Sequence, residues 1–491
     1  MRSLPVCVAL LALSACALGS GWVGQERVNR PDGDTADSDP TVIVDGAGCP
    51  WVVWDATPGD TTLWWTRWLG SAWAAQRGVC QNAPGVWASC GPDLAVDGQD
   101  RVWLVWQNAH ENDNCNIAAC YYDGSQWTVE QPVSPPDSDS TDVYFQPKVS
   151  CGGGQTWCVW YGGPSTSLPY SVYASRWDSL RGRWGPEMRV SPPDGNEHWW
   201  CDVAVDSSGT PHVVWCTHPL YTVFYSHFDG QAWVTPTPVN DTTQVTASPW
   251  ASPRIVIDRS GMMHLCFTGA KVGASHRDIV YTRNDGSGWL PCQMLTHDSV
   301  NDVWYSDVAA DRPDNVWVTW DLQGGTEQFS VHVSHWDGVA WSSEQRLDDT
   351  TSYYNCGPAV CLDSSGGPWV FWTGVPYTGP VTDDDVFFNR FTNASLEEDR
   401  QAPPAHVAIL RCATLQDRSC FAASFSLAEA ARVRLVLCDG AGRCVAVLAD
   451  GNMPRGTHTA HCRTPVAPGA YFCRLQTGGR FETSKVILLG Q

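Results

Sequence analysis

Aromatic and acidic side chains are concentrated in five short segments that separate apolar stretches of the chain. These segments span residues 32–39, 137–145, 194–202, 297–307 and 348–355. Exposed aromatic rings beside carboxylates suit stacking on sugar rings combined with hydrogen bonds to hydroxyls, and they suit gripping an extended peptide equally well. The candidate ligand-binding residues in and around these segments are Tyr144, Trp199, Trp200, Trp250, Trp304, Tyr305, Tyr353 and Tyr354.

The same aromatic residues also have a purely structural interpretation, in which they hold neighbouring units of the fold at the correct angle. Patterns for catalysis are weak. Ser226-His227 and Ser334-His335 are adjacent pairs on predicted strands, where successive side chains point to opposite faces, so they do not form nucleophile–base couples. A carboxylate pair for glycoside hydrolysis among the many acidic loop residues stays open. No calcium-binding loop and no zinc-type spacing of cysteine and histidine occurs, so we expect neither a metal nor a cofactor.

A repeat positions these segments. It consists of an apolar strand ending in Asp, a turn, and a second strand ending in an aromatic residue nine positions after the Asp; in one copy Cys151 replaces the Asp. Repeats of this length are typical of stacked or circular architectures. The seven pairs are Asp45/Trp54, Asp97/Trp106, Cys151/Trp160, Asp206/Trp215, Asp258/Phe267, Asp311/Trp320 and Asp363/Trp372.

Each copy has the elements of a four-stranded propeller blade. Continuous Val, Leu and Trp runs such as 51–54 suit strands that are buried on both faces, and the Asp suits a turn in which it binds nearby backbone amides. A third strand follows, and then a Trp opens a short fourth strand, at Trp127, Trp184, Trp233, Trp289 and Trp341.

The two ends of the repeat array complement each other. The last copy lacks the closing Trp, whereas residues 21–29 resemble the fourth strand at 340–348. An N-terminal strand that completes the last blade removes the open edge of the array. The sequence therefore predicts an all-β fold, with a seven-bladed β-propeller over residues 21–399 that is closed by an N-terminal strand.

The turns before the fourth strands resemble the Asp-box turns of sialidase-like propellers. They run from Ser226 to Trp233, from Thr282 to Trp289 and from Ser334 to Trp341, with the Asp one place later than in the standard box. The resemblance implies the fold more than the activity. A sialidase site would need three clustered arginines, whereas only Arg254 stands on a predicted innermost strand, and no Arg-Ile-Pro motif occurs. The sequence favours a protein that is not an enzyme, with an Asp-box glycoside hydrolase as the alternative.

Residues 1–19 have the pattern of a signal peptide, with an apolar run from Val6 to Leu13 followed by small residues. Residues 13–16 also resemble a bacterial lipobox, which leaves lipidation of Cys16 open. No later stretch is long and apolar enough for a transmembrane helix. Disulfides are typical of exported chains, and the close pairs are Cys80/Cys90, Cys115/Cys120 and Cys438/Cys444.

After a proline-containing linker at 400–406, residues 407–491 carry several strand patterns. This part resembles the Ig-like C-terminal sorting domain of the type IX secretion system, which is related to the Ig-like domain of flagellar hook-capping proteins. The resemblance implies a β-sandwich, passage across the outer membrane, and the secretion machinery as a partner; a plain accessory sandwich is the alternative. Cys462 departs from the family, which often has Trp there. The matching residues are Asp439, Gly442, Arg443, Gly456, His458, Pro468, Gly469, Tyr471, Lys485 and Val486.

Acidic residues outnumber basic ones by 52 to 30, which gives a formal net charge of −22. Such a surface argues against nucleic acid and anionic membranes as partners. We therefore expect a secreted or cell-surface propeller, extracellular or associated with the bacterial outer membrane, that binds a glycan or an extracellular protein without catalysis. A glycoside hydrolase and a structural surface protein are the alternatives.

Overall fold

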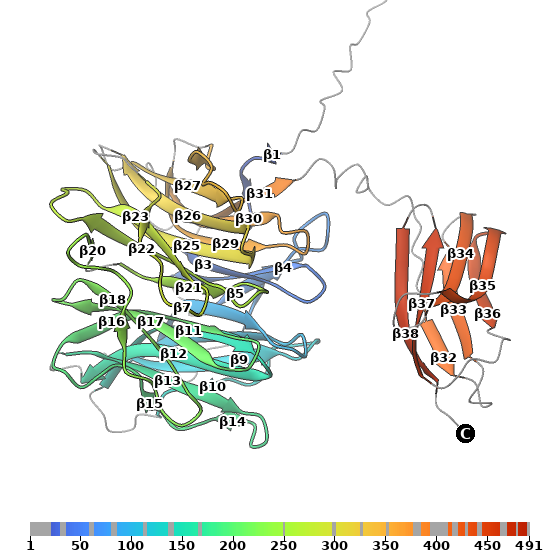
Figure 1. The fold of residues 1–491 in the computed structure, drawn as a ribbon, viewed down its shortest axis with the longest axis horizontal. Coiled ribbons are helices and arrows are strands. Elements are labelled where there is room, and N and C mark those ends of the chain that lie inside the picture. Colours follow the sequence, from blue (N-terminus) through green and yellow to red (C-terminus); the bar gives the residue numbers. More distant parts are fainter. Residues whose placement is uncertain are drawn as a thin grey trace, which may run out of the picture. The chain divides into compact units, whose positions relative to one another are not determined.

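The computed structural model describes residues 21–29, 36–57, 63–79, 86–110, 115–135, 142–164, 169–248, 251–296, 301–324, 328–349, 353–376, 384–392, 411–414, 421–427, 431–438, 444–461, 469–477 and 480–488. These residues form strands, turns and connections only, without a helix, so the predicted all-β class is confirmed (Figure 1). The described residues accordingly include no helix capable of spanning a bilayer. The predicted signal peptide and linker lie outside the described residues. The chain divides into two compact units, Met1–Asn393 and Ala394–Gln491.

The first unit is a β-propeller of seven antiparallel blades, numbered here in chain order. The outermost strands are short. The Trp residues predicted to open them instead close the preceding hairpin through a single bridge, as in Phe228 with Trp233, except that Trp184 of blade 3 lies in the two-residue strand β14. The strands, from the inner to the outer edge, are β3 (Ala36–Val44), β4 (Pro50–Thr57), β5 (Trp64–Arg67) and β6 (Arg77–Gly78) in blade 1; β7 (Val86–Val96), β8 (Val102–His110), β9 (Cys115–Tyr122) and β10 (Gln131–Pro132) in blade 2; β11 (Asp142–Gly152), β12 (Gln155–Pro164), β13 (Ser171–Asp178), β14 (Arg183–Trp184) and β15 (Met188–Arg189) in blade 3; β16 (Glu197–Val205), β17 (Pro211–His218), β18 (Thr222–His227) and β19 (Thr237–Pro238) in blade 4; β20 (Val245–Ala247), β21 (Arg254–Ile257), β22 (Met263–Lys271), β23 (Asp278–Asn284) and β24 (Gln293–Met294) in blade 5; β25 (Asp302–Arg312), β26 (Asn315–Gly324), β27 (Gln328–Trp336) and β28 (Gln345–Arg346) in blade 6; and β29 (Tyr353–Leu362), β30 (Pro368–Pro376) and β31 (Asp385–Thr392) in blade 7.

The outer strand of blade 7 comes from the N-terminal end of the described chain. β1 (Gly21–Trp22) and β2 (Glu26–Arg27) pair antiparallel with β31, and Figure 1 shows β1 beside this strand. The Trp22 ring packs edge-on against Trp317 of blade 6 at 6.0 Å, and its Nε1–H donates to Gln345 Oε1 at 2.9 Å. The expected pairing of the residues near Trp22 with the last blade is therefore present.

The repeated Asp residues make the turns between the first two strands of the blades. Asp206 Oδ1 accepts the backbone N–H groups of Ser208 and Thr210, and Asp258 does the same for Ser260 and Met262. The second carboxylate oxygen faces the side chain six positions later; in Asp45 it accepts from Trp51 Nε1–H at 2.8 Å. Five of the six Asp residues thus fix the hairpin and the start of the next strand, as the repeat predicted for the turn. Asp311 differs, since it accepts from the side chain of Asn315 at 2.7 Å.

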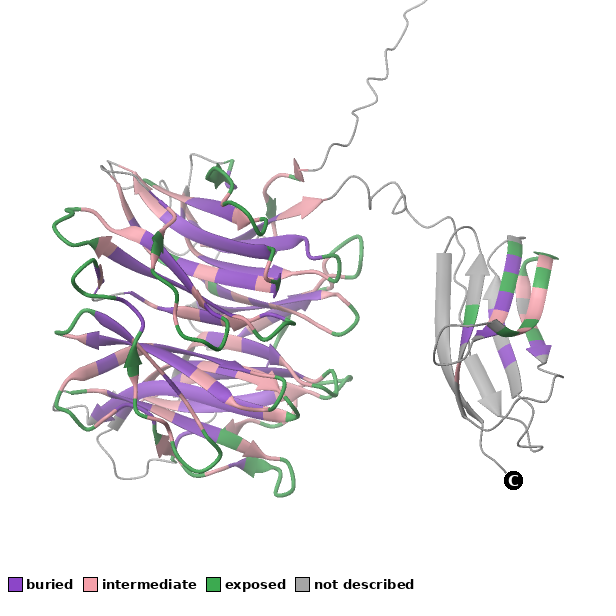
Figure 2. Cartoon of the chain, viewed as in Figure 1, coloured by how far each residue is buried: buried purple, intermediate pink, exposed green. Residues whose placement is uncertain are grey.

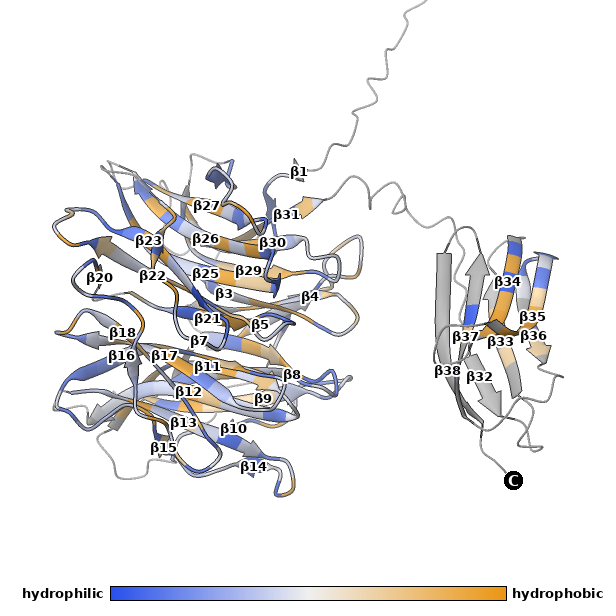
Figure 3. Cartoon of the chain, viewed as in Figure 1, coloured by the Kyte–Doolittle hydropathy of each residue, from blue (hydrophilic) through white to orange (hydrophobic). Residues whose placement is uncertain are grey.

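The strand-end aromatic residues are core residues. Trp54, Trp106, Trp160, Trp215, Phe267, Trp320 and Trp372 are all inaccessible to solvent, and the middle strands of the blades form the buried layers in Figure 2. The same strands carry the hydrophobic bands in Figure 3.

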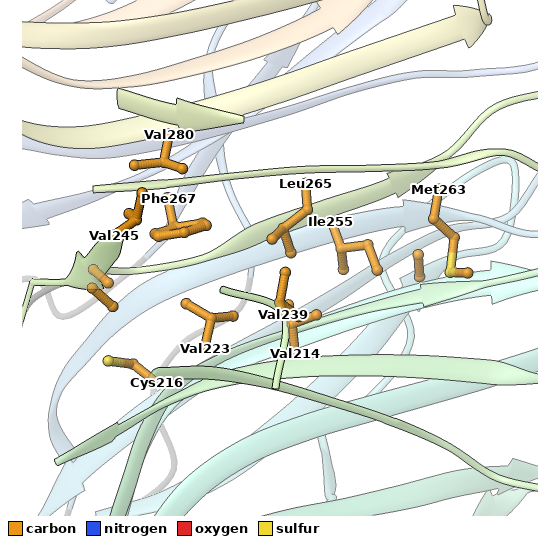
Figure 4. Close-up of a cluster of buried hydrophobic side chains, with 13 residues drawn as sticks. Val214, Cys216, Val223, Val239, Val245, Ile255, Met263, Leu265, Phe267 and Val280 are labelled. Atoms are coloured by element: carbon orange, nitrogen blue, oxygen red, sulfur yellow. The ribbon is translucent and has the colours of Figure 1, made fainter. Parts of the chain in front are cut away.

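The core continues from each blade to the next. Figure 4 shows Val214 and Cys216 of blade 4 facing Leu265 and Phe267 of blade 5. Burial of each such side chain contributes about 1.5–3 kcal/mol, so contacts between blades stabilise the propeller as a whole.

The geometry of β9 excludes one of the predicted disulfides. Cys115 and Cys120 lie five positions apart on β9, so their side chains leave opposite faces of the strand, and no disulfide joins them. The prediction of this disulfide was wrong. Cys80 lies outside the described residues, and Cys90 forms no disulfide in the part of the chain that is described. Cys438 and Cys444 are directly opposite on paired strands, but their side chains are not described.

The second unit is a two-sheet β-sandwich. One sheet has the order β32 (Arg411–Thr414), β33 (Phe421–Leu427), β36 (Gly456–His461), and the other β35 (Cys444–Met453), β34 (Ala431–Cys438), β37 (Gly469–Thr477), β38 (Arg480–Leu488). Phe425 of the first sheet shares a core with Leu435 and Cys473 of the second, all nearly inaccessible to solvent. The assignment of this sandwich to a sorting family stays a prediction.

Candidate functional site at the mouth of the central channel

The innermost strands of all seven blades surround a channel. Their later halves line a cavity of about 640 Å³ whose walls are mostly Val, Ala and Ile. The Asp turns follow these strands at one end of the channel, whereas the beginnings of the strands lie at the other end. We call this second end the mouth.

Charged residues of alternating sign occupy one equivalent position on five consecutive inner strands. We call this set, Asp93, Lys148, Asp202, Arg254 and Asp307, the charged ring. Lys148 Nζ lies 3.2 Å from Asp93 Oδ1, and Arg254 Nε lies 3.2 Å from Asp307 Oδ1. The aspartates also accept backbone N–H groups of the following blade: Asp93 in blade 2 accepts from Val149 in blade 3, and Asp202 in blade 4 accepts from Ile255 in blade 5, each at 2.8 Å. The ring therefore joins blades by ion pairs and backbone hydrogen bonds together.

Arg254 is part of this ring. The neighbouring carboxylate of Asp307, followed by Asp202, raises the pKa of the Arg254 guanidinium, although its burial opposes this shift. Its positive charge is thus already neutralised within the propeller. Apart from Arg254, the only cation at an equivalent inner position is Lys148, so the described inner strands hold no cluster of three arginines.

Two residues before the charged-ring position, the regular pairing of each inner strand with the second strand of its blade is interrupted. In six blades the residue there has a positive φ, between 37° at Ser252 and 61° at Gly357, and in the remaining blade Tyr305 lies at a register shift. Non-glycine residues rarely adopt this conformation, and such residues cluster at binding sites. We call these seven the bulge residues: Asp39, Gly91, Gln146, Trp200, Ser252, Tyr305 and Gly357.

Three of the bulges are held by the preceding blade, through the residue that follows its strand-end aromatic residue. Asp321 of blade 6 accepts the N–H of Gly357 in blade 7 at 3.1 Å, and Thr373 of blade 7 accepts the N–H of Asp39 in blade 1 at 3.0 Å. Gln107 accepts from Gln146 N–H in the same way, at 3.4 Å. The bulges are thus a repeated, hydrogen-bonded feature of the mouth rather than irregularities of single blades.

Two of the bulge residues are aromatic and partly exposed. Tyr305 is 43% exposed, and Trp200 is half-buried with its ring 6.0 Å from that of Tyr161. The polar bulge residues Asp39, Gln146 and Ser252 stand at equivalent places on other blades. One ring of positions therefore combines stacking surfaces with hydrogen-bonding groups, which is the combination that sugar recognition requires.

Three carboxyl groups with raised pKa values surround the mouth. The Asp39 side chain retains solvent-accessible surface, but protein atoms surround it on the inner side of the blades. The resulting desolvation raises its pKa. Asp55 is buried, and burial and then the charge of Asp39 raise its pKa well above the ordinary value. Asp321 is inaccessible to solvent, and burial raises its pKa to about 6.

Only some of the site residues predicted from the sequence lie at the bulge positions. Trp200 and Tyr305 occupy equivalent positions of the mouth, on blades 4 and 6. Their neighbours Trp199 and Trp304 are half-buried and already engaged: Trp199 lies 6.2 Å from the His218 ring, and Arg277 stacks 3.7 Å above Trp304.

Tyr354 is not a bulge residue, and its ring lies 6.2 Å from that of Phe329. Tyr144 is only 5% exposed and packs against Trp160 and Tyr173 in the core between blades, so its assignment to an exposed aromatic ring was wrong. Trp250 lies outside the described residues, and only the backbone of Tyr353 is described.

The prediction missed Asp39, Gln146 and Ser252. A signal for them exists, because the bulge residues recur with the spacing of the strand-end aromatics, fourteen or fifteen positions before each. Their varied side chains concealed it. No group of three or more potential metal ligands is found among the residues that the structure describes, and the expectation of no metal or cofactor stays a prediction.

Comparisons with known proteins give a structural likeness. No protein-family model matches the sequence, and no curated protein matches it. An ulvan lyase, described as a new family of polysaccharide lyase, is 10% identical with a TM-score of 0.51, covering 75% of this chain and 95% of its own. An α-L-arabinanase from Penicillium chrysogenum is also 10% identical, with a TM-score of 0.44 over 76% of this chain and 99% of its own. A Hadza microbial sialidase is 13% identical, with a TM-score of 0.43 over 64% and 66%. At such identity the likeness shows the fold alone.

Proposed function

We propose that the propeller is an exported, non-catalytic module that binds a glycan at the mouth of its central channel. One observation carries the proposal: the partly exposed rings of Trp200 and Tyr305 occupy equivalent bulge positions in a ring that also holds Asp39, Gln146 and Ser252. The rings would stack on pyranose faces, and the polar groups would bind hydroxyls. The backbone N–H groups of Asp39, Gln146 and Gly357 donate to neighbouring blades, and that of Tyr305 donates to Asp321 of its own blade, so the site would be largely preformed.

The charge of the mouth favours a neutral glycan. Asp39, Asp55 and Asp321 gather there, and the nearest cation of the charged ring, Lys148, already pairs with Asp93. A sialylated, sulfated or uronate-rich chain would meet carboxylates without an available cation, which costs free energy in a partly desolvated site.

The known requirements of a sialidase are not supplied by these residues. A Tyr nucleophile must be readily deprotonated, whereas partial burial, with Asp321 and Asp39 nearby, raises the pKa of Tyr305. Arg254 is neutralised by Asp307.

A glycoside hydrolase remains the second candidate because of Asp39 and Asp55. Burial, followed by the charge of Asp39, raises the pKa of Asp55, and such a pair suits one protonated acid and one ionised base. Asp55, however, is 7% exposed and accepts a hydrogen bond from Ser38 Oγ at 2.9 Å, so it is poorly placed to reach a substrate.

The test is a glycan-array screen of the full chain, run beside a panel of fluorogenic glycosides. We expect binding to neutral glycans without turnover. Turnover that disappears in Asp39→Asn would replace the binding module by the hydrolase. No signal on either assay would contradict the glycan proposal and leave a protein ligand or a structural role.

Export is the second part of the proposal and rests on the C-terminal resemblance. The matching residues, such as Gly456 and His458, lie on β36 of the sandwich. A tagged chain truncated before residue 407 should stay in the cells of a type IX-competent bacterium, whereas the full chain should reach the medium or the surface. Equal export of both chains would contradict this part.

A further inference from the structure

A second recessed surface lies on the outside of the propeller, away from the mouth. It is a groove of about 810 Å³ between the outer parts of blades 2, 3 and 4. Its floor includes Trp157 and Phe228, and Arg176, Arg181 and Arg183 line its walls. We call it the arginine groove. Three arginines in one groove are unexpected in a chain of net charge −22.

The hairpin that supplies these arginines departs from the other blades. In blades 2, 4, 5 and 6 the turn residue Asp lies four positions before the Trp, as from Asp229 to Trp233, and no basic residue stands between them. In blade 3 the distance from Asp178 to Trp184 is six, and the enlarged turn contains Leu180, Arg181 and Arg183. Because the blades fold alike, the other copies show that the fold itself requires neither the extra length nor the arginines.

The register of the hairpin places the charges on one face. Asp178 pairs directly with Arg183 across β13 and β14, and Arg176 precedes Asp178 by two positions, so the three side chains share a face. The opposite face carries Trp177 and Trp184, whose rings lie 4.9 and 5.7 Å from that of Trp103.

Two of the arginines have no acidic partner among the described residues. Asp178 accepts Arg181 Nη1–H at 2.7 Å and also the backbone N–H groups of Leu180 and Arg181, so its charge is used within the turn. Arg176 stacks over Trp157 at 5.8 Å, which holds its guanidinium at the groove. Among the residues that the structure describes, no carboxylate lies within 4.0 Å of Arg176 or Arg183. Glu187 is the other acidic residue of the lining.

The tip of the hairpin is apolar. Leu180 is 97% exposed, the most exposed large hydrophobic side chain described. Arginine and aromatic side chains around an apolar residue are typical of protein–protein contacts, whereas a hydrophilic glycan gains little from a leucine.

We propose that the arginine groove binds an acidic segment of a partner protein, with Arg176 and Arg183 pairing with its carboxylates and Leu180 packing against an apolar residue of the segment. The aromatic floor shields these ion pairs from water, which strengthens them. The general acidity of the propeller would repel such a segment elsewhere, so the groove also orients it.

Fluorescence anisotropy of a labelled peptide of repeated Glu-Glu-Leu triplets, titrated with the full chain at low salt, tests the proposal. We expect saturable binding that weakens with added salt. The double variant Arg176→Gln/Arg183→Gln should lose at least about tenfold in affinity, and Leu180→Ala several-fold. Arg77→Gln is the matched control, an exposed arginine on the outer strand β6 of blade 1, and should bind like the unmodified chain.

A charge-reversed peptide of Lys-Lys-Leu triplets and a dextran sulfate chain complete the design. Absence of acidic-peptide binding, or equal binding by the double variant whose thermal midpoint is unchanged, would overturn the proposal. Binding of dextran sulfate but not of the peptide would overturn it in favour of an anionic glycan. Because none of these residues is at the mouth, failure here leaves the glycan proposal unaffected.

Discussion

Asp202 Oδ2 in blade 4 accepts the backbone N–H of Ile255 in blade 5 at 2.8 Å. The same bond recurs between Asp307 of blade 6 and Val360 of blade 7, also at 2.8 Å. These aspartates replace sheet hydrogen bonds, which do not run between these blades, and they fix the height of one inner strand against the next. The bulge residues lie two positions from this ring, so their placement at the mouth depends on it.

Asp307→Ala should destabilise the propeller by about 2–4 kcal/mol, because it removes the acceptor of Val360 N–H and leaves the half-buried Arg254 guanidinium without its nearest carboxylate. Equilibrium unfolding in urea measures this. Asp349→Ala, which removes an exposed carboxylate, should change the free energy of unfolding by less than about 0.5 kcal/mol. Equal effects of the two substitutions would show that the charged ring contributes no stability.

Gly91→Ala tests the strained backbone at the bulges. Gly91 has φ of 59° and open space around the position of an added Cβ, so the expected loss of about 1 kcal/mol comes from conformation alone. Gly98→Ala also meets open space but at an ordinary φ, and it should be neutral or slightly stabilising. Differential scanning calorimetry compares the two; a Gly91→Ala chain as stable as Gly98→Ala would contradict the assigned conformation.

The stability of the propeller should carry a signature of Asp321 between about pH 4 and pH 6. Burial raises its pKa from 3.8 to about 6, so the native state binds more protons than the unfolded state in this window and stability falls as the pH rises. Asp321→Asn lacks this decline. Relative to the unmodified chain it should gain on the order of 1–3 kcal/mol on going from about pH 4 to pH 7.

Urea midpoints measured across this range for both chains check the prediction, with Asp349→Asn as the exposed control. The comparison of slopes is independent of any constant cost of replacing the carboxylate. Parallel profiles for the unmodified chain and Asp321→Asn would show that Asp321 is ionised as easily when folded as when unfolded.

The sequence predicted those features that are local or repeated. The residues equivalent to Asp45 and Trp54 are nine positions apart in every blade, so one pattern located the turns and the buried strand ends. Even the pairing of Trp22 with the last blade followed from a comparison of short segments. These features depend on neighbouring residues and on a period that the chain repeats seven times.

The mouth was predicted only in part because its geometry depends on contacts between blades. Gln107 and Gln146 are 39 positions apart, and nothing in their local sequences indicates that one holds the bulge of the other. Tyr144 and Trp200 look alike as loop aromatics, yet Tyr144 faces the core between blades and Trp200 stands on a bulge. Which face an aromatic residue occupies is decided by the position of the bulge, which the sequence pattern did not reveal.

The most direct test of the central claim is calorimetric titration of the full chain, Trp200→Ala and Tyr221→Ala with a neutral glycan that the array identifies. Tyr221 is the matched control, since it is 39% exposed in blade 4 and lies outside the bulge ring. Trp200→Ala should lose about 2 kcal/mol of binding free energy, about thirtyfold in Kd, and Tyr221→Ala should bind normally. Unchanged binding by Trp200→Ala would contradict the placement of the site at the bulge residues of the mouth.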